Sequence, residues 1–193
     1  MTDHTVKAFD DDITRLRGLV AEMGGLAEVA ITQAMDALVR HDEVLAGEVV
    51  ERDRKINALN GEIDKLSIRV LALRAPMADD LREVVATLKI AGELERIGDY
   101  SKNIAKRVGA IEQRKKFEPL TLLPAMSGIA ATMVHDVLTA YAARDPVLAG
   151  EVMERDEKVD AFYDSIFRNL LSHMMENPSS ITSAAQLLFV ARN

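Results

Sequence analysis

The sequence predicts an all-α protein made of two tandem, pseudo-symmetric three-helix bundles. The apolar residues, 48% of the chain, are mostly aliphatic, whereas aromatic residues make up 4% and Trp is absent. This composition is typical of long helices packed through aliphatic side chains. Apolar residues recur at steps of three and four, the spacing of one helix face. A nine-residue segment occurs twice with one difference, which indicates a duplicated unit.

The first two helices are expected in the segment that ends before Pro76. Apolar residues spaced three and four apart run from Val6 to Leu38, and the glycines Gly24 and Gly25 interrupt them. Because glycine weakens a helix, we expect a bend or a close helix contact there. Asp42 is the expected N-cap of the second helix, which ends before Pro76 because proline disfavours helical geometry in the residue before it.

Four further helices are expected in the rest of the chain. Two acids precede the third helix and several cations follow its end, as the helix dipole favours. A proline at the first helical position marks the start of the fifth. The expected bounds are about Leu81–Ile111 for the third helix, a linker at Phe117–Pro119, a fourth helix to about Ala143, a fifth at Pro146–Glu176, and a sixth after Asn177–Ser180.

The repeat divides the chain into two units, 1–116 and 117–193. Leu45–Asp53 recurs as Leu148–Asp156, with eight of nine positions identical, and the match includes Gly, Arg and Asp as well as apolar residues. Generic helical periodicity does not reproduce such residues at matched places. Toward Asn193 the second copy aligns with the middle of the third helix, so we expect its last helix to be truncated.

Charge and composition exclude several classes of protein. The chain has no Cys, which excludes disulfides, thiolate metal sites and cysteine nucleophiles. Its net charge of −7 argues against binding of nucleic acid, whose phosphates require basic partners. The first residues lack the basic start and apolar centre of a signal peptide, and no uninterrupted apolar run approaches the roughly 18 residues of a membrane span. We therefore expect a cytoplasmic protein.

The third helix carries two acids on one face. Glu95 and Asp99 are four residues apart, so their side chains are neighbours, and like charges at this spacing need a basic partner or a bound cation. Asp53 and Asn57 have the same spacing on the second helix. Oxygen ligands on facing helices are what hard cations prefer in bundles. A cation site between these two helices is one interpretation of the pattern.

The second repeat carries acids at the equivalent positions. Asp156 and Asp160 correspond to Asp53 and Asn57, so a similar site is expected there. The alternative interpretation is a solvated face on which the acids of the first repeat pair with nearby cations. The candidate cations are Arg52, Arg96 and Lys102. The four histidines are scattered and recreate no Glu-x-x-His pair of a di-iron site.

These motifs resemble those of the PhoU family over essentially the whole chain. The matching stretches are Glu51–Asn57, Gly92–Asp99 and the helix turn Ala75–Arg82, together with the duplication. The resemblance implies two three-helix bundles and a metal ion or small metal cluster held by carboxylates. The metal would be iron, zinc, magnesium or manganese.

By resemblance, the ligands would be Glu95, Asp99 and Asp53 in the first repeat, and Asp156 and Asp160 in the second. Two departures weaken this assignment. Asn57 stands where the motif has an acid, which removes one negative charge. The acids expected on the sixth helix would follow position 193, so the second site cannot be complete within this sequence.

No catalytic motif is visible, so an enzyme is not expected. Resemblance to the PhoU family implies a negative regulator of phosphate uptake and of the phosphate-starvation response. Such an adaptor would connect a phosphate ABC transporter ATPase to a sensor histidine kinase and would act as a homodimer. Two alternatives stay open, a carboxylate-bridged di-metal enzyme and a metal-free helical scaffold. Peripheral contact of the basic residues at 106–116 with an anionic membrane surface also stays open.

Overall fold

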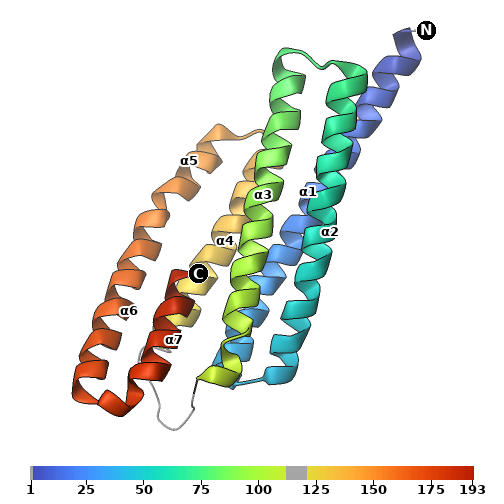
Figure 1. The fold of residues 1–193 in the computed structure, drawn as a ribbon. Helices are drawn as coiled ribbons and strands as arrows, with labels where there is room; N and C mark the ends of the chain where they lie inside the picture. The colour runs from blue at the N-terminus through green and yellow to red at the C-terminus, as the bar shows by residue number, and fades with distance from the viewer. Residues whose placement is uncertain (1, 112–120) are drawn as a thin grey trace.

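The protein, analysed as a computed structural model, is described for residues 2–111 and 121–193 (Figure 1). These residues form helices and short connections, with no strand among them. The α-helices are α1 (Thr2–Arg40), α2 (Glu43–Arg74), α3 (Ala78–Ala105), α4 (Leu122–Ala143), α5 (Pro146–Glu154), α6 (Asp156–Glu176) and α7 (Ile181–Arg192). The described residues also form the 3-10 helices η1 (Val108–Ala110) and η3 (Pro178–Ser180). The all-α prediction is confirmed.

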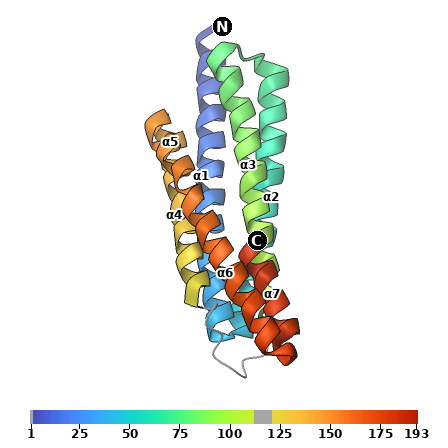
Figure 2. The same cartoon turned by 90° about the vertical axis from the view of Figure 1, so that its left-hand side faces the viewer.

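Helices α1, α2 and α3 lie side by side as one antiparallel trio, and α4 to α7 lie along one side of it (Figures 1 and 2). Helix α4 packs on α1, and α7 approaches α3. The boundary predicted at 116/117 and the linker at 117–119 lie outside the described residues. The three-helix arrangement of the first repeat brings α2 and α3 into direct contact, which is where the predicted site lies.

The helix ends follow the predicted local chemistry. The Oδ1 atom of Asp42 accepts hydrogen bonds from the backbone N–H groups of Val44 and Leu45, both at 3.0 Å. Asp145 caps α5 in the same way, with distances of 2.9 and 3.1 Å. Each cap satisfies backbone donors that the first turn of a helix cannot pair internally. The N-cap predicted at Asp42 is confirmed, and Asp145 is its counterpart in the second repeat.

The core of the first trio consists of the apolar residues that the spacing predicts. The fully buried side chains are contributed by all three helices, and burying one large aliphatic side chain stabilises the fold by about 2 kcal/mol. They include Leu16, Val20, Met23, Ile56, Ile63, Val70 and Val84. Leu73 follows Val70 at the same spacing of three, but it is 70% exposed because it lies in the last turn of α2.

A second buried cluster joins the two halves of the chain. Ala34 and Leu38 of α1 and Ile104 of α3 pack in the same cluster as Leu170 of α6 and Leu187 of α7. Each of these side chains is buried. The halves therefore share a core, which fixes α4 to α7 against the first trio.

Two predicted helix ranges are wrong. The helix expected at 146–176 is divided at Arg155. The N–H group of Arg155 donates a hydrogen bond to the carbonyl of Val152, three residues earlier, at 3.1 Å. This 3-10-type bond tightens the turn and redirects the chain. The helix expected to reach Ile111 ends at Ala105. The chain then turns through η1, which buries Val108 and Ile111 in the shared cluster.

The glycine pair in α1 marks a close helix contact rather than a helix end. A Cβ atom at Gly24 would overlap the Cδ1 atom of Leu138 in α4, whereas a Cβ atom at Gly25 would meet nothing within 4 Å. The backbone of α1 is helical on both sides of the pair. The absence of a side chain at Gly24 thus lets α4 approach α1.

Helix α4 is unusually apolar for a helix at the surface of a bundle. Among the described helices, it alone is long and apolar enough on average to cross a membrane, by length and composition only. Only 11% of its most apolar window is buried. One such helix is weak evidence of a membrane span, and α4 packs on α1.

Candidate functional site

Lys102 lies between two of the predicted ligands, Asp53 and Asp99. Its Nζ atom donates a hydrogen bond to Asp53 Oδ2 at 2.7 Å and contacts Asp99 Oδ1 as well. Asp53 is on α2 and the other two residues are on α3, so the ion pairs cross the helix interface. Asp53 and Asp99 therefore pair with a nearby cation, as the second interpretation of the sequence has it, and that cation is Lys102.

Burial makes this cluster different from an ordinary surface ion pair. The Asp53 side chain is 7% exposed and that of Lys102 is 21% exposed, whereas Asp99 is 41% exposed. The hydrogen bonds to Asp53 and Asp99 raise the pKa of Lys102 above its ordinary value, against the opposing effect of burial. Lys102 therefore stays positively charged at neutral pH and compensates the buried carboxylate.

The close approach of α2 and α3 positions Asp53. Gly98 faces α2, and a Cβ atom there would lie 2.9 Å from Ile56 Cδ1 and 3.4 Å from Asp53 Oδ1. Asp53 is one turn from Ile56 on the buried face of α2. The missing side chain at Gly98 therefore allows α3 to pack against the helix face that carries Asp53.

Asn57 serves Asp53 as a hydrogen-bond donor. Its Nδ2 atom donates to Asp53 Oδ2 at 2.9 Å and to the Asp53 backbone carbonyl at 3.0 Å. Because both partners only accept, the nitrogen end of the amide has to face them. The amide oxygen of Asn57 therefore points away from Asp53, unlike a carboxylate, which would offer an oxygen on either side.

The remaining predicted residues do not join this cluster. Glu95 is half-buried and, within residues 2–111 and 121–193, makes no hydrogen bond or ion pair. Asp156 and Asp160 lie on α6 and are exposed. Asp156 borders a cavity of about 330 Å³ lined mainly by apolar side chains, with Ile97 of α3 on another wall. The exposure of both aspartates contrasts with the burial of Asp53, their repeat equivalent.

The donors in the described part of the chain do not fit a metal site. Across residues 2–111 and 121–193, no group of three or more His, Asp or Glu side chains could hold a metal ion. Asp53 and Asp99 share an ammonium group, and Asn57 presents N–H to them. Metal binding through Glu95, Asp99, Asp53, Asp156 and Asp160 stays a prediction.

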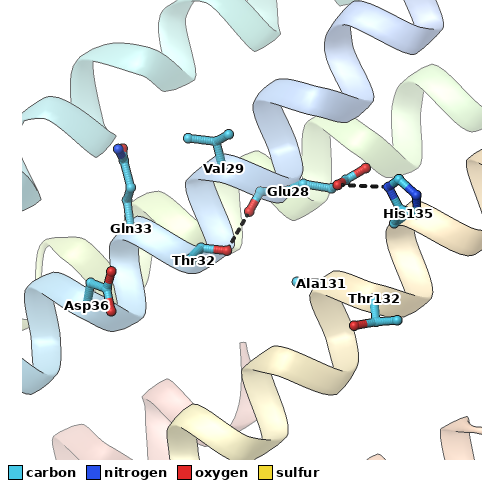
Figure 3. Close-up of a pocket in the computed structure, with 8 residues that line it drawn as sticks. All are labelled: Glu28, Val29, Thr32, Gln33, Asp36, Ala131, Thr132 and His135. Atoms are coloured by element: carbon cyan, nitrogen blue, oxygen red, sulfur yellow. Dashed lines mark hydrogen bonds and ion pairs between the residues drawn. The ribbon is translucent and has the colours of Figure 1, made fainter.

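A polar groove between α1 and α4 was missed in the sequence. It is lined by Glu28, Val29, Thr32, Gln33 and Asp36 of α1 and by Ala131, Thr132 and His135 of α4 (Figure 3). His135 Nδ1 lies 3.2 Å from Glu28 Oε2. The two residues are 107 positions apart, so no local spacing could have revealed this contact between the repeats.

A half-buried glutamate forms a second link between the repeats. Glu83 of α3 pairs with Arg17 of α1 at 2.5 Å and with Arg144, which follows α4. Burial alone would raise the pKa of Glu83, but the hydrogen bond from Arg17 and the charges of Arg17 and Arg144 outweigh it and lower that pKa. Nearby, Thr87 Oγ1 of α3 and Tyr141 Oη of α4 form a 2.7 Å hydrogen bond.

We expect Glu83→Gln to lower the free energy of unfolding at pH 7, because it removes the charge that pairs with Arg17 and Arg144. The loss should be only about 1 kcal/mol, since both arginine side chains are about half or more exposed and solvent weakens the pairing. The pKa of Glu83 is lower in the folded state, so its contribution is fully present above its ordinary value of 4.5 and is lost as the pH falls through the folded pKa. Urea unfolding at neutral pH and near pH 3 measures this difference.

Glu62→Gln is the matched control for Glu83→Gln, since Glu62 pairs with Arg15 and both side chains are well exposed. We expect no measurable change for that control at either pH. An effect of Glu83→Gln that is equal at neutral and acidic pH would show that the charge of Glu83 does not stabilise the fold.

Comparison with known proteins gives one family throughout. The family model described as the PhoU domain matches residues 20–108 and again residues 123–193, which supports the duplication. A relative from Zymomonas mobilis, named phosphate-specific transport system accessory protein PhoU homolog, is 48% identical over 98% of this chain and 80% of the relative. A relative of the same name from Caulobacter vibrioides is 42% identical over 100% of this chain and 84% of its own.

Solved structures agree with these relatives. The crystal structure of PhoU from Pseudomonas aeruginosa superposes with a TM-score of 0.91 at 32% identity, covering 95% of this chain and 88% of that one. The phosphate transport system regulatory protein PhoU from Streptococcus pneumoniae superposes with a TM-score of 0.87 at 27% identity, covering 95% and 86%. The fold of two tandem three-helix units predicted from the repeat is thereby confirmed.

Proposed function

Because this chain belongs to the PhoU family, we propose that it is an accessory protein of the phosphate-specific transport system and acts as a cytoplasmic, non-catalytic adaptor. The observation that carries the proposal is the 48% identity to a protein of that name, which extends over 98% of this chain. Similarity of this extent includes both repeats and the interface between them, rather than one shared motif.

In the finer form of the proposal, the adaptor represses phosphate uptake and the phosphate-starvation response when phosphate is plentiful. Its partners are the ATPase of a phosphate ABC transporter and a sensor histidine kinase. A bundle with long helical faces suits such a role, because partner helices dock on apolar side chains at helical spacing. Phe167 and Leu171 on α6 are four residues apart and are 41% and 46% exposed. They offer one such face.

Deletion of the gene in its own host tests this role. A phosphate-starvation promoter fused to a reporter should be active in the deletion strain at high phosphate, and the wild-type gene supplied in trans should restore repression. Repression that stays normal in the deletion strain would refute the regulatory role. It would leave family membership untouched, since that depends on sequence and fold.

The proposed partners and the homodimer require separate measurements. The purified chain should bind the cytoplasmic part of the sensor kinase and the transporter ATPase in titration calorimetry. Light scattering should give about twice the 21.2 kDa mass of one chain if it forms a dimer. Binding to neither protein would count against the adaptor proposal, and a mass of one chain would count against the dimer.

A further inference from the structure

We infer that Lys102 is a built-in counter-ion that occupies the place of a divalent cation between Asp53 and Asp99, so that the first repeat of this chain holds no metal ion there. The sequence motif by itself predicts the opposite. The inference depends on where the ammonium lies and not on the family to which the chain belongs.

The first step is the need of Asp53 for a positive charge. Its side chain is 7% exposed, and burying an ionised carboxylate is costly unless a cation compensates it. Among the described residues, Lys102 is the cation that forms an ion pair with Asp53. Asn57 adds a neutral hydrogen bond to the same oxygen, Oδ2, but no charge.

The second step is the position of the Lys102 ammonium. It contacts one oxygen of Asp53 and one of Asp99, which is the bridging position between α2 and α3 that a shared metal ion would need. Two cations cannot share that position, because like charges at contact distance repel strongly where water is scarce. A divalent ion could enter only if the lysine side chain left.

The third step concerns the free oxygen of Asp53. Oδ1 is buried and has no hydrogen-bond partner among the described residues. It faces the space above Gly98, where a Cβ atom would be 3.4 Å away. The pair thus contains one unused, buried ligand atom. Removing the lysine should leave a site that attracts a cation, with Oδ1, Asp99 and, one turn away on α3, Glu95 as oxygen donors.

The test uses manganese as the probe in a chain that carries Asp156→Asn and Asp160→Asn, so that bound metal reports on the first repeat. The chain is stripped with EDTA and dialysed, and MnCl₂ is added. Bound Mn²⁺ is counted by the electron paramagnetic resonance of the free ion, and the melting temperature is recorded in parallel. We expect no bound Mn²⁺ and no change in melting temperature with Lys102 present.

Replacing Lys102 should create the site. We expect Lys102→Met to bind one Mn²⁺ per chain at concentrations at least roughly tenfold below any at which the parent chain retains the ion, and the melting temperature should rise with added MnCl₂. Lys102→Gln should behave in the same way if the methionine variant folds poorly. Lys102→Arg keeps the charge and should bind none. Lys106→Met is the matched control, because Lys106 directly follows α3 and is exposed, so its replacement should change nothing.

Two results would overturn the inference. One is stoichiometric Mn²⁺ binding by the parent chain that disappears with Asp53→Asn, which would mean that the metal displaces Lys102. The other is a folded Lys102→Met or Lys102→Gln chain with no gain in Mn²⁺ binding. The measurement on the parent chain and on Asp53→Asn requires neither lysine variant, so the inference can fail even if neither of them folds.

Discussion

In metal-free buffer, Lys102→Met should lower the free energy of unfolding by about 2–3 kcal/mol, because breaking a buried ion pair leaves an uncompensated charge. That charge is on Asp53, whose side chain is 7% exposed and whose Oδ1 atom already lacks a hydrogen-bond partner among the described residues. The estimate is below the 3–5 kcal/mol of fully buried pairs because Lys102 is 21% exposed and water can reach part of the site.

Chemical denaturation followed by circular dichroism measures this loss. Lys106→Met is the control, with an expected change within about 0.5 kcal/mol because Lys106 is exposed. Combining Lys102→Met with Asp53→Leu should recover part of the loss, since a buried pair replaced by apolar side chains is often no less stable. A loss from Lys102→Met no larger than that of the control would mean that Asp53 does not depend on the lysine.

The local features of the fold could be predicted because they depend on residues close in sequence. Asp42 and Asp145 cap helices through backbone groups two and three residues away. The buried face of α2 follows a spacing that the chain itself displays, as with Ile56 and Ile63. Such patterns are complete within a few turns of helix, so no knowledge of other helices is needed.

Features that depend on packing between helices could not be predicted. Gly24 was compatible with a bend or a close contact, and only the position of Leu138 on α4 decides between them. The break at Arg155 has no signal in the repeat either, because the equivalent Arg52 lies within the unbroken helix α2. A sequence pattern does not contain the register of one helix against another.

The candidate site shows the same limit. The spacing of Asp53, Asp99 and Glu95 identified the helix faces that meet, but Lys102 was one of three possible counter-ions. The register places it 49 residues from Asp53 in sequence and 2.7 Å away in space. Arg52 bonds instead to Gln33, and Arg96 to Glu93. The choice among the three cations is made by geometry that only the packed helices define.

The two repeats conserve one interaction and diverge in another. Arg52 bonds to Gln33 and Arg155 bonds to Asp136, so matched arginines reach residues 19 positions earlier in both copies. This contact fixes the second helix of each unit to its first. The acidic positions differ, since Asp53 is buried against α3 whereas Asp156 is exposed. Duplication has therefore kept the packing contact while the surroundings of the acid have changed.

Gly98→Val is expected to lower the free energy of unfolding by about 2 kcal/mol, because it adds a side chain where α2 and α3 are in contact. Its Cβ atom would lie 2.9 and 3.2 Å from Ile56 Cδ1 and Cγ2. The γ branches of the Ile56 side chain have little freedom to move, since β-branched residues in helices keep one χ1 rotamer. The few tenths of a kcal/mol that valine gains over glycine in helix propensity do not offset this overlap.

Gly92→Val on the same helix is the matched control, because a Cβ atom at Gly92 would meet nothing within 4 Å. It should be neutral or slightly stabilising. Combining Gly98→Val with Ile56→Ala should cost at least about 1 kcal/mol less than the sum of the single changes, since the smaller residue makes room for the larger one. Strict additivity in chemical denaturation would mean that the two side chains do not meet, and the close approach of α2 and α3 that positions Asp53 would then need another cause.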